Sequence, residues 1–90
     1  MTTAPRIPAA RLPAYFRSPA QVRVGAVVFD QDKEMVAVAR RVAGTEVTVE
    51  RPSGLTWQVS YRRLRPGTRH EAQQLRALAR LHRVQRRGRN

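Results

Sequence analysis

Hydrophobic and polar residues alternate clearly in two segments of the chain. Valine alternates with glutamate and threonine over residues 45–51, and Trp57, Val59 and Tyr61 alternate with polar residues over residues 55–63. Successive side chains of a strand point to opposite faces of a sheet, so a period of two predicts strands with one buried face. Both segments are therefore expected to be half-buried β-strands.

Two earlier segments are also rich in β-branched residues but alternate less clearly. They are QVRVGAVVFD at residues 21–30 and EMVAVARRV at residues 34–42, and the turn sequences DQDK, AGT and PSG separate the four segments. Weak alternation is expected of curved strands that are buried on parts of both faces. Four short strands joined by tight turns predict an antiparallel meander. A meander this short is expected to curl into a small barrel, because closure covers its edges.

The pattern changes again after the fourth segment. RRLRPG at residues 62–67 is expected to be a short connecting turn, because it ends in a Pro-Gly pair. Thr68 and Glu71 then fit a capping box, in which each side chain accepts a hydrogen bond from the backbone amide of the other residue. This pair predicts the start of a helix.

The helix is predicted to run from about Arg69 to Arg86, within a basic segment at residues 68–87 and before a frayed tail at residues 88–90. Its apolar positions share one face at about 100° per residue, and that face is expected to lie against the barrel. The residues on this face are Leu75, Leu78, Ala79 and His82.

Residues 1–20 contain four prolines, which forbid a long helix or a central strand. This segment is therefore expected to be a flexible arm rich in proline and arginine. Leu12, Tyr15 and Phe16 are the residues through which it could dock. We expect them to cover an edge of the domain, and an arm that binds a partner or inserts into a groove is the alternative.

The segments VGAVVFD and LTWQVSYRRLRP, with Gly25 in the first of them, resemble small SH3-like barrels of the KOW and Tudor type. In those barrels a glycine-containing first strand precedes three more strands and a final one-turn helix. The resemblance covers about residues 21–66 and does not include the basic helix. It implies a mainly β fold, namely a small antiparallel barrel of four to five strands followed here by one arginine-rich α-helix. Such barrels commonly bind nucleic acids or proteins.

Charge narrows the class of partner. The 90 residues carry 18 Lys and Arg against 6 Asp and Glu, a formal net charge of +12, and Lys33 is the only lysine. Residues 51–90 hold eleven of the arginines against a single acid, Glu71. A field of this sign favours phosphate polymers or anionic membrane surfaces as partners. A GC-rich genome also enriches arginine, so the positions of the arginines carry more information than their number.

Several arginines form a stripe on the predicted helix. Arg76, Arg80, Arg83 and Arg87 fall within about 60° of arc, and Arg69 lies on the same line. Like charges at these spacings repel each other, and no acid sits among them, whereas a solvated helix face normally mixes signs. A phosphate-binding face is therefore expected, with a solvated face in an arginine-biased proteome as the alternative. The residues expected to bind nucleic acid are Arg62, Arg63, Arg65, Arg69, Arg76, Arg80, Arg83, Arg86 and Arg87.

No catalytic, cofactor or metal site is expected. The chain has no cysteine, and His70 and His82 are too far apart in sequence to form an i, i+4 metal pair. Asp30, Asp32 and Glu34 fall where a hairpin turn is expected, and their carboxylates are predicted to be solvated. The sequence therefore argues against an enzyme.

The function predicted from the sequence is that of a small nucleic-acid-binding accessory or regulatory protein of the bacterial cytoplasm, for example in transcription, with DNA favoured over RNA. Binding would be directed mainly at the backbone, since no base-reading residue is identified and Trp57 and Tyr61 are expected in the core rather than on a base-stacking platform. The alternative is a module that binds an acidic protein, such as a polymerase or replication component. No apolar run approaches the roughly 20 residues of a membrane span. A helix lying on a membrane surface is the weakest alternative, because its apolar face is small and lacks Trp or Phe anchors, so no membrane partner is expected. Ala77, Leu81 and Val84 lie off the main apolar face, which leaves a homodimer open.

Overall fold

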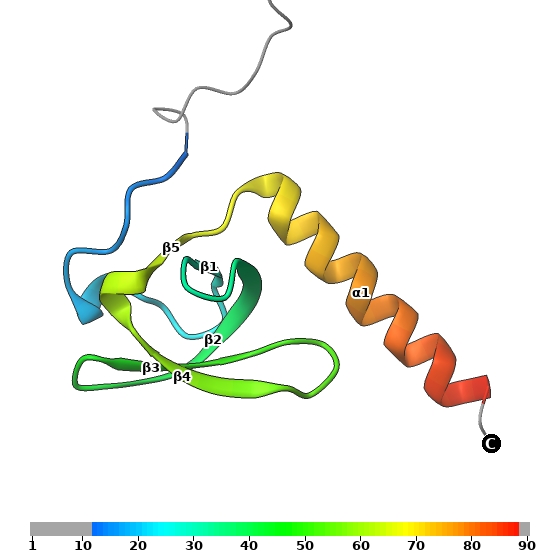
Figure 1. Ribbon diagram of the computed structural model, residues 1–90. Coiled ribbons are helices and arrows are strands. Elements are labelled where there is room, and N and C mark those ends of the chain that lie inside the picture. The colour runs from blue at the N-terminus through cyan, green and yellow to red at the C-terminus, as the bar shows by residue number, and fades with distance from the viewer. Residues whose placement is uncertain (1–11, 89–90) are drawn as a thin grey trace, which may run out of the picture.

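The protein consists of five antiparallel strands and one long helix (Figure 1). The computed structural model describes residues 12–88, with side chains as far as Gln85. The elements in chain order are the 3₁₀ turn η2 (Pro19–Gln21), β1 (Val27–Asp30), β2 (Met35–Ala43), β3 (Glu46–Glu50), β4 (Thr56–Ser60), the 3₁₀ turn η3 (Tyr61–Arg63), β5 (Leu64–Pro66) and α1 (Arg69–Gly88). The strands are ordered β4-β3-β2-β1-β5 in one sheet. The expected mainly β fold with a C-terminal helix is confirmed. The sheet is open, with β4 and β5 at its edges, so it is a barrel only in a loose sense.

Two strand boundaries differ from the sequence prediction. β1 begins at Val27 rather than near residue 21, because the chain turns at Gly25, whose φ of +93° favours glycine. Residues 64–66, expected in a connecting turn, form β5 and pair with β1. The turn η3 directs the chain back along the free edge of β1, and Ser60 caps it by accepting a hydrogen bond from the amide of Arg62. Backbone groups along that edge are thereby paired.

One face of the sheet carries the main core. The alternation predicted for the third and fourth strands is confirmed, because Val47, Val49 and Val59 are buried while their neighbours are more exposed. Tyr61 is also buried, as expected, and Trp57 packs against the same cluster from a half-buried position. The other members of this core are Val22, Val28, Ala37, Ala39 and Leu64.

The opposite face of the sheet is covered by the first half of α1. Val27, Val36 and Val38 lie on this face and are half-buried, and α1 packs against β2 there. Leu75 of the helix is only 5% exposed, and Ala79 is half-buried. Because β1 and β2 bury side chains on both faces, they lack the clear alternation of the later strands, as the sequence predicted.

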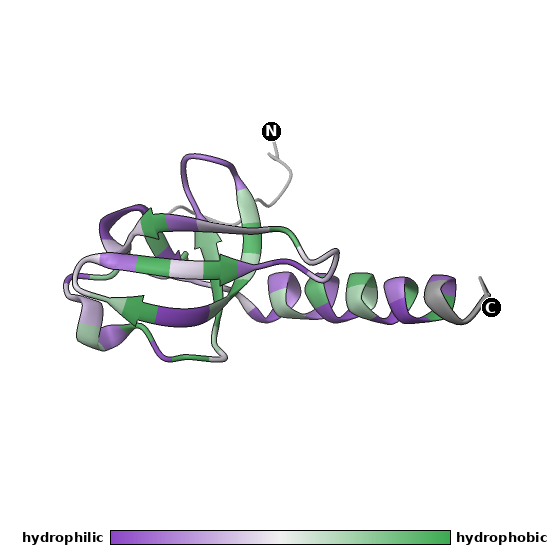
Figure 2. Cartoon of the chain, turned by 90° about the horizontal axis from the view of Figure 1, so that it is seen from below, coloured by the Kyte–Doolittle hydropathy of each residue, from purple (hydrophilic) through white to green (hydrophobic). Residues whose placement is uncertain are grey.

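Beyond this contact the helix extends away from the sheet. Figure 2 shows α1 running outward from one end of the strands to the C-terminal end of the chain. No helix in residues 12–88 is both long enough and apolar enough to cross a membrane. The rest of the predicted tail, residues 89–90, lies outside the described residues.

The last part of the predicted arm lies along the edge strand β5. The amide of Phe16 donates a hydrogen bond to the carbonyl oxygen of Leu64 at 3.0 Å, and the Phe16 ring packs against the core. Tyr15 is half-buried, whereas Leu12 is 44% exposed. Residues 15 and 16 thus cover the edge that β5 would otherwise leave open. Residues 1–11 of the predicted arm lie outside the described residues.

Candidate nucleic-acid interface

The start of α1 is defined by the predicted capping box. The amide of Thr68 donates to Glu71 Oε1 at 2.9 Å, and the amide of Glu71 donates to Thr68 Oγ1 at 3.1 Å. The carboxylate also lies at the positive end of the helix dipole, where an anion is favoured. The helix therefore begins where the sequence predicts.

Arg65, which the sequence predicted to bind phosphate, is instead buried and paired inside the fold. It is 6% exposed, and its Nη1 and Nη2 donate to the two carboxylate oxygens of Glu71 at 2.9 and 2.8 Å. Nη1 also donates to the carbonyl oxygen of Pro66, and the guanidinium lies 4.2 Å from the centre of the Phe29 ring. A buried charge needs a partner, and Glu71 supplies it inside the fold. Arg65 is thus a structural residue that joins β5 to α1.

The ion pair between Arg65 and Glu71 shifts the pKa values of both side chains. Hydrogen bonding by Arg65 is the main reason that the pKa of the Glu71 carboxyl lies below its ordinary 4.5, and the backbone hydrogen bond from Thr68 adds to this effect. The hydrogen bond to Glu71 likewise raises the pKa of Arg65. Both groups are therefore charged at neutral pH, which favours the ion pair between β5 and α1.

The helix arginines are exposed on one side of α1. Arg69, Arg76, Arg80 and Arg83 are all exposed, next to the face that Leu75 buries against the sheet. Within the described side chains the ion pairs are Arg40–Glu50, Arg63–Asp32 and Arg65–Glu71, so none of these four is neutralised by a carboxylate. Arg86 and Arg87 belong to the last turns of α1, and their side chains lie outside the described residues. We call Arg69, Arg76, Arg80 and Arg83 the helix stripe.

Arg62 and Arg63 are separated from the helix start by β5. Both are exposed in η3, which precedes β5, whereas α1 follows it (Figure 1). The guanidinium of Arg62 lies 5.2 Å from the centre of the Tyr61 ring, and Arg63 Nε lies 3.6 Å from Asp32 Oδ2. The structure therefore gives these two arginines partners of their own and does not place them in line with the first turn of α1.

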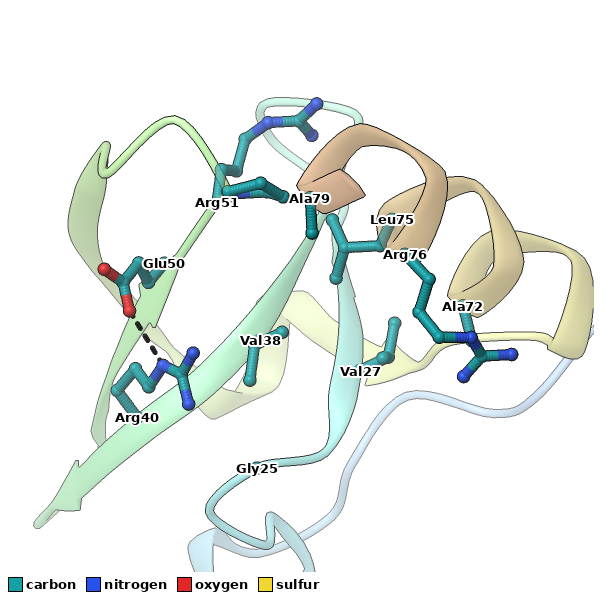
Figure 3. A pocket seen from close by; sticks show the side chains of 11 residues that line it. Gly25, Val27, Val38, Arg40, Glu50, Arg51, Ala72, Leu75, Arg76 and Ala79 are labelled. Carbon is teal, nitrogen blue, oxygen red and sulfur yellow. Dashed lines mark hydrogen bonds and ion pairs between the residues drawn. The ribbon is translucent and has the colours of Figure 1, made fainter. Parts of the chain in front are cut away.

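A groove runs between α1 and the sheet, beside the helix stripe. Arg76 lines it from the helix, and Arg40 and Arg51 line it from the sheet. Val27 and Val38 lie on its floor, with Arg40 and Arg76 on opposite sides of them (Figure 3). Sequence reasoning missed Arg40 and Arg51, because their position depends on how the helix crosses the strands.

The other side of α1 presents apolar side chains. Leu81 and Val84 are 51% and 59% exposed, and Ala77 is also exposed. Ala77 and Leu81 line a second groove, whose opposite wall includes Met35 at the start of β2. These are the residues that the sequence placed off the main apolar face, and the structure leaves them exposed.

The prediction that the carboxylates of the turn after β1 are solvated is wrong for Asp30. Its side chain is 2% exposed rather than solvated, and Oδ2 accepts a hydrogen bond from Trp57 Nε1 at 2.7 Å. Oδ1 accepts from the amides of Asp32 and Lys33, so the carboxylate also shapes the turn between β1 and β2. Asp32 and Glu34 are exposed, as predicted.

The described residues contain no group of three or more His, Asp or Glu side chains placed to hold a metal ion. The four arginines of the helix stripe form a row of positive charge without a carboxylate partner among the described side chains. Such a surface can bind anions through charge-assisted hydrogen bonds. No protein-family model, curated protein or solved structure matched the chain.

Proposed function

We propose that this protein is a small nucleic-acid-binding accessory or regulatory protein that holds a sugar–phosphate backbone along α1. The observation that carries the proposal is the helix stripe, four exposed arginines on one side of a helix with no carboxylate partner among the described side chains. Like charges three and four residues apart destabilise a helix, and a bound polyanion removes that repulsion.

The chemistry of the stripe suits phosphate rather than base edges. A guanidinium is planar and donates two parallel hydrogen bonds to a phosphate, and it remains charged at any physiological pH. Gln73 and Gln74 are exposed, but nothing directs them toward a base edge. Binding is therefore directed at the backbone, with little dependence on base sequence. DNA is the favoured ligand.

A salt titration tests this function. Binding of the full chain to labelled DNA and RNA oligonucleotides, single-stranded and duplex, is measured from low to physiological salt. The test variant is Arg76→Ala/Arg80→Ala/Arg83→Ala, and the matched control is Arg17→Ala/Arg23→Ala/Arg41→Ala, which removes the same charge from exposed arginines outside the stripe. Thermal unfolding first verifies that both variants are folded.

The proposal predicts a steep salt dependence for the wild-type protein and the control, and a much flatter one for the stripe variant. Three lost phosphate contacts reduce the slope of log K against log salt by about 2.7 on duplex DNA, at roughly 0.9 per contact. Equal losses for the two variants would show that net charge alone drives binding. No binding of the wild-type protein at physiological salt would refute the function.

A second candidate is a protein-interaction module for an acidic partner. The observation in its favour is the exposed apolar side of α1, where Leu81 and Val84 lie on the same helix as the arginines. Exposed apolar residues beside charged ones are typical of a surface that binds another protein. Loss of partner capture in Leu81→Ser/Val84→Ser, with nucleic-acid binding unchanged, would identify this surface as the interaction site.

A further inference from the structure

The groove between α1 and the sheet has arginines on two opposite walls. Arg76 lines the helix wall, and Arg40 lines the sheet wall, across the apolar floor of Val27 and Val38 (Figure 3). Its volume is about 390 Å³, within the usual range for ligand pockets of roughly 300–1,000 Å³. The helix stripe is therefore not an isolated surface, because one of its members, Arg76, lines the same groove as Arg40 of the sheet.

Arg40 reaches this groove by the ordinary alternation of β2, because it lies two residues after Val38, which is on the groove face. A β-bulge lies at the same position. In β2, Ala39 pairs with Val49 and Arg41 pairs with Thr48, so Arg40 is an extra residue without a partner in β3. Ala39 and Val42 both pack in or against the core on the other face, although they are three residues apart. The bulge thus turns two successive arginines away from the core, as bulges commonly re-aim side chains. Only the first of the two, Arg40, lines the groove.

Glu50 is the ion-pair partner of Arg40. Arg40 Nε donates to Glu50 Oε1 at 2.8 Å, and the two side chains are 52% and 35% exposed. Exposed ion pairs of this kind contribute little stability, so a phosphate can replace the carboxylate as the partner of Arg40. Among the described residues, Glu50 is also the one acid that lines this groove, where it opposes the entry of an anion.

Arg51 is the third arginine that lines this groove. Its Nη1 donates to the carbonyl oxygen of Val36 at 2.8 Å, which fixes the side chain beside Leu75 of the helix. A guanidinium has five N–H donors, so this hydrogen bond leaves donors on the same fork. Its charge adds to those of Arg40 and Arg76 around one cavity.

We infer that this groove is a phosphate-binding site in which Arg76 and Arg40 grip one sugar–phosphate strand from opposite sides, and that Glu50 weakens binding by competing for Arg40. The inference rests on the proposed function and extends it from the helix surface to the sheet. The ligand is the phosphodiester backbone, because the groove offers guanidinium groups above a short apolar floor, and none of the described residues that line it is an aromatic on which a base could stack.

Two pairs of single substitutions test this site, each with a matched control in the same strand. Arg40→Gln is compared with Arg41→Gln, which removes the same charge from an exposed residue outside the groove. Glu50→Gln is compared with Glu46→Gln, which removes an exposed acid from the same strand. Affinity for a single-stranded and a duplex oligonucleotide is measured at one fixed salt concentration, after thermal unfolding has shown that each variant is folded.

The proposed site predicts weaker oligonucleotide binding when Arg40 is replaced and tighter binding when Glu50 is replaced. Arg40→Gln should weaken binding by roughly tenfold, as expected for the loss of one phosphate contact near 0.1 M salt, and Arg41→Gln by less than about twofold. Glu50→Gln should tighten binding by at least about threefold more than Glu46→Gln, because it frees Arg40 and removes an anion from the groove. The oligonucleotide with the larger difference identifies the form of strand that the groove holds.

The outcomes separate this inference from the proposed function. Equal effects within each pair, together with lost binding in the stripe variant, would overturn the groove site and leave the helix stripe as the binding surface. Weaker binding in Glu50→Gln would also overturn it, because the carboxylate would then support the ligand rather than compete with it. A wild-type protein that binds no oligonucleotide would overturn the function itself.

Discussion

Arg65 on β5 and Glu71 in the first turn of α1 form a bidentate ion pair, with Nη1–Oε1 and Nη2–Oε2 distances of 2.9 and 2.8 Å. The same carboxylate closes the capping box with Thr68. One side chain therefore determines both where the helix begins and how it is attached to the sheet. Because α1 packs on the sheet only through its first half, this joint also sets the direction of the helix and the opening of the neighbouring groove.

Glu71→Gln should destabilise the protein strongly. Glutamine can keep the capping hydrogen bonds, but it leaves the buried guanidinium of Arg65 without a counter-charge. Breaking a buried pair by removing one partner typically lowers the free energy of unfolding by about 3 kcal/mol. Urea unfolding measures the change. Glu34→Gln, at an exposed position, is the control and should stay within about 0.5 kcal/mol of wild type.

The same carboxylate should make stability depend on pH in the acid range. The pKa of Glu71 lies below 4.5 in the folded protein because Arg65 hydrogen-bonds to it. Its contribution is therefore fully present above about pH 4.5, the unfolded value, and is lost as the pH falls through the folded-state pKa. Urea midpoints at pH 7 and pH 3 should show a smaller drop for Glu71→Gln than for wild type. An identical drop in both proteins would show that other carboxylates cause the acid sensitivity.

Asp30→Asn should destabilise the core and change the emission of Trp57, the only tryptophan. The asparagine amide cannot accept hydrogen bonds at both ends, as the carboxylate does for Trp57 Nε1 and for the turn amides. Hydrogen bonds to charged groups contribute about 1.5–3 kcal/mol, so we expect a loss of that size in urea unfolding followed by fluorescence. Asp32→Asn removes an exposed acid of the same turn and should have little effect. Equal stabilities for the two variants would contradict a structural role for Asp30.

Gly67→Ala should destabilise the joint between β5 and α1. A Cβ at this position would lie 2.6 Å from Val27 Cγ1 and 3.1 Å from the Val27 carbonyl oxygen, which accepts the Gly67 amide. Overpacking of this kind typically lowers the free energy of unfolding by about 1–3 kcal/mol. Val27→Ala removes the nearer atom, so the double variant should be more stable than the sum of the single changes predicts. Strict additivity would show that the two residues do not clash.

Single substitutions in the helix stripe should act on the salt dependence of binding. If Arg80 contacts one phosphate, Arg80→Gln lowers the slope of log K against log salt by about 0.9 on duplex DNA. Arg23→Gln, at an exposed residue outside the stripe, should leave the slope unchanged. The measurement is a binding titration at several salt concentrations with the same duplex. A lower affinity with an unchanged slope would indicate that Arg80 supports the helix rather than the ligand.

Much of the local structure could be predicted from the sequence. The alternation of valine with polar residues located β3, the capping box located the start of α1, and the helical spacing placed four arginines on one side of the helix. Each of these depends on residues close together in the chain. The short strand β5 was missed, because three residues carry no periodic signal and their pairing with β1 is a long-range contact.

The candidate site was only partly predictable for the same reason. Arg65 was expected to bind phosphate, yet it faces Glu71, and Asp30 was expected in solvent, yet it binds Trp57. Nothing in the local sequence distinguishes these two residues from exposed neighbours of the same charge. Their partners are found only when distant segments meet. Arg40 lies on the same face of β2 as Val38 by strand alternation, but the groove that it lines exists only because α1 packs beside that face.

By itself, the sequence determined the strand and helix patterns, the excess of positive charge and the side of α1 on which arginines gather, because these follow from backbone periodicity and local hydrogen bonds. Only the tertiary structure decided which charged side chains remain exposed and free to contact a ligand. It buried Arg65 against Glu71, left the helix stripe exposed, and brought Arg40 of β2 opposite Arg76 of α1. Burial and pairing are properties of the whole packed chain, since a side chain loses its solvent only when residues far away in sequence cover it.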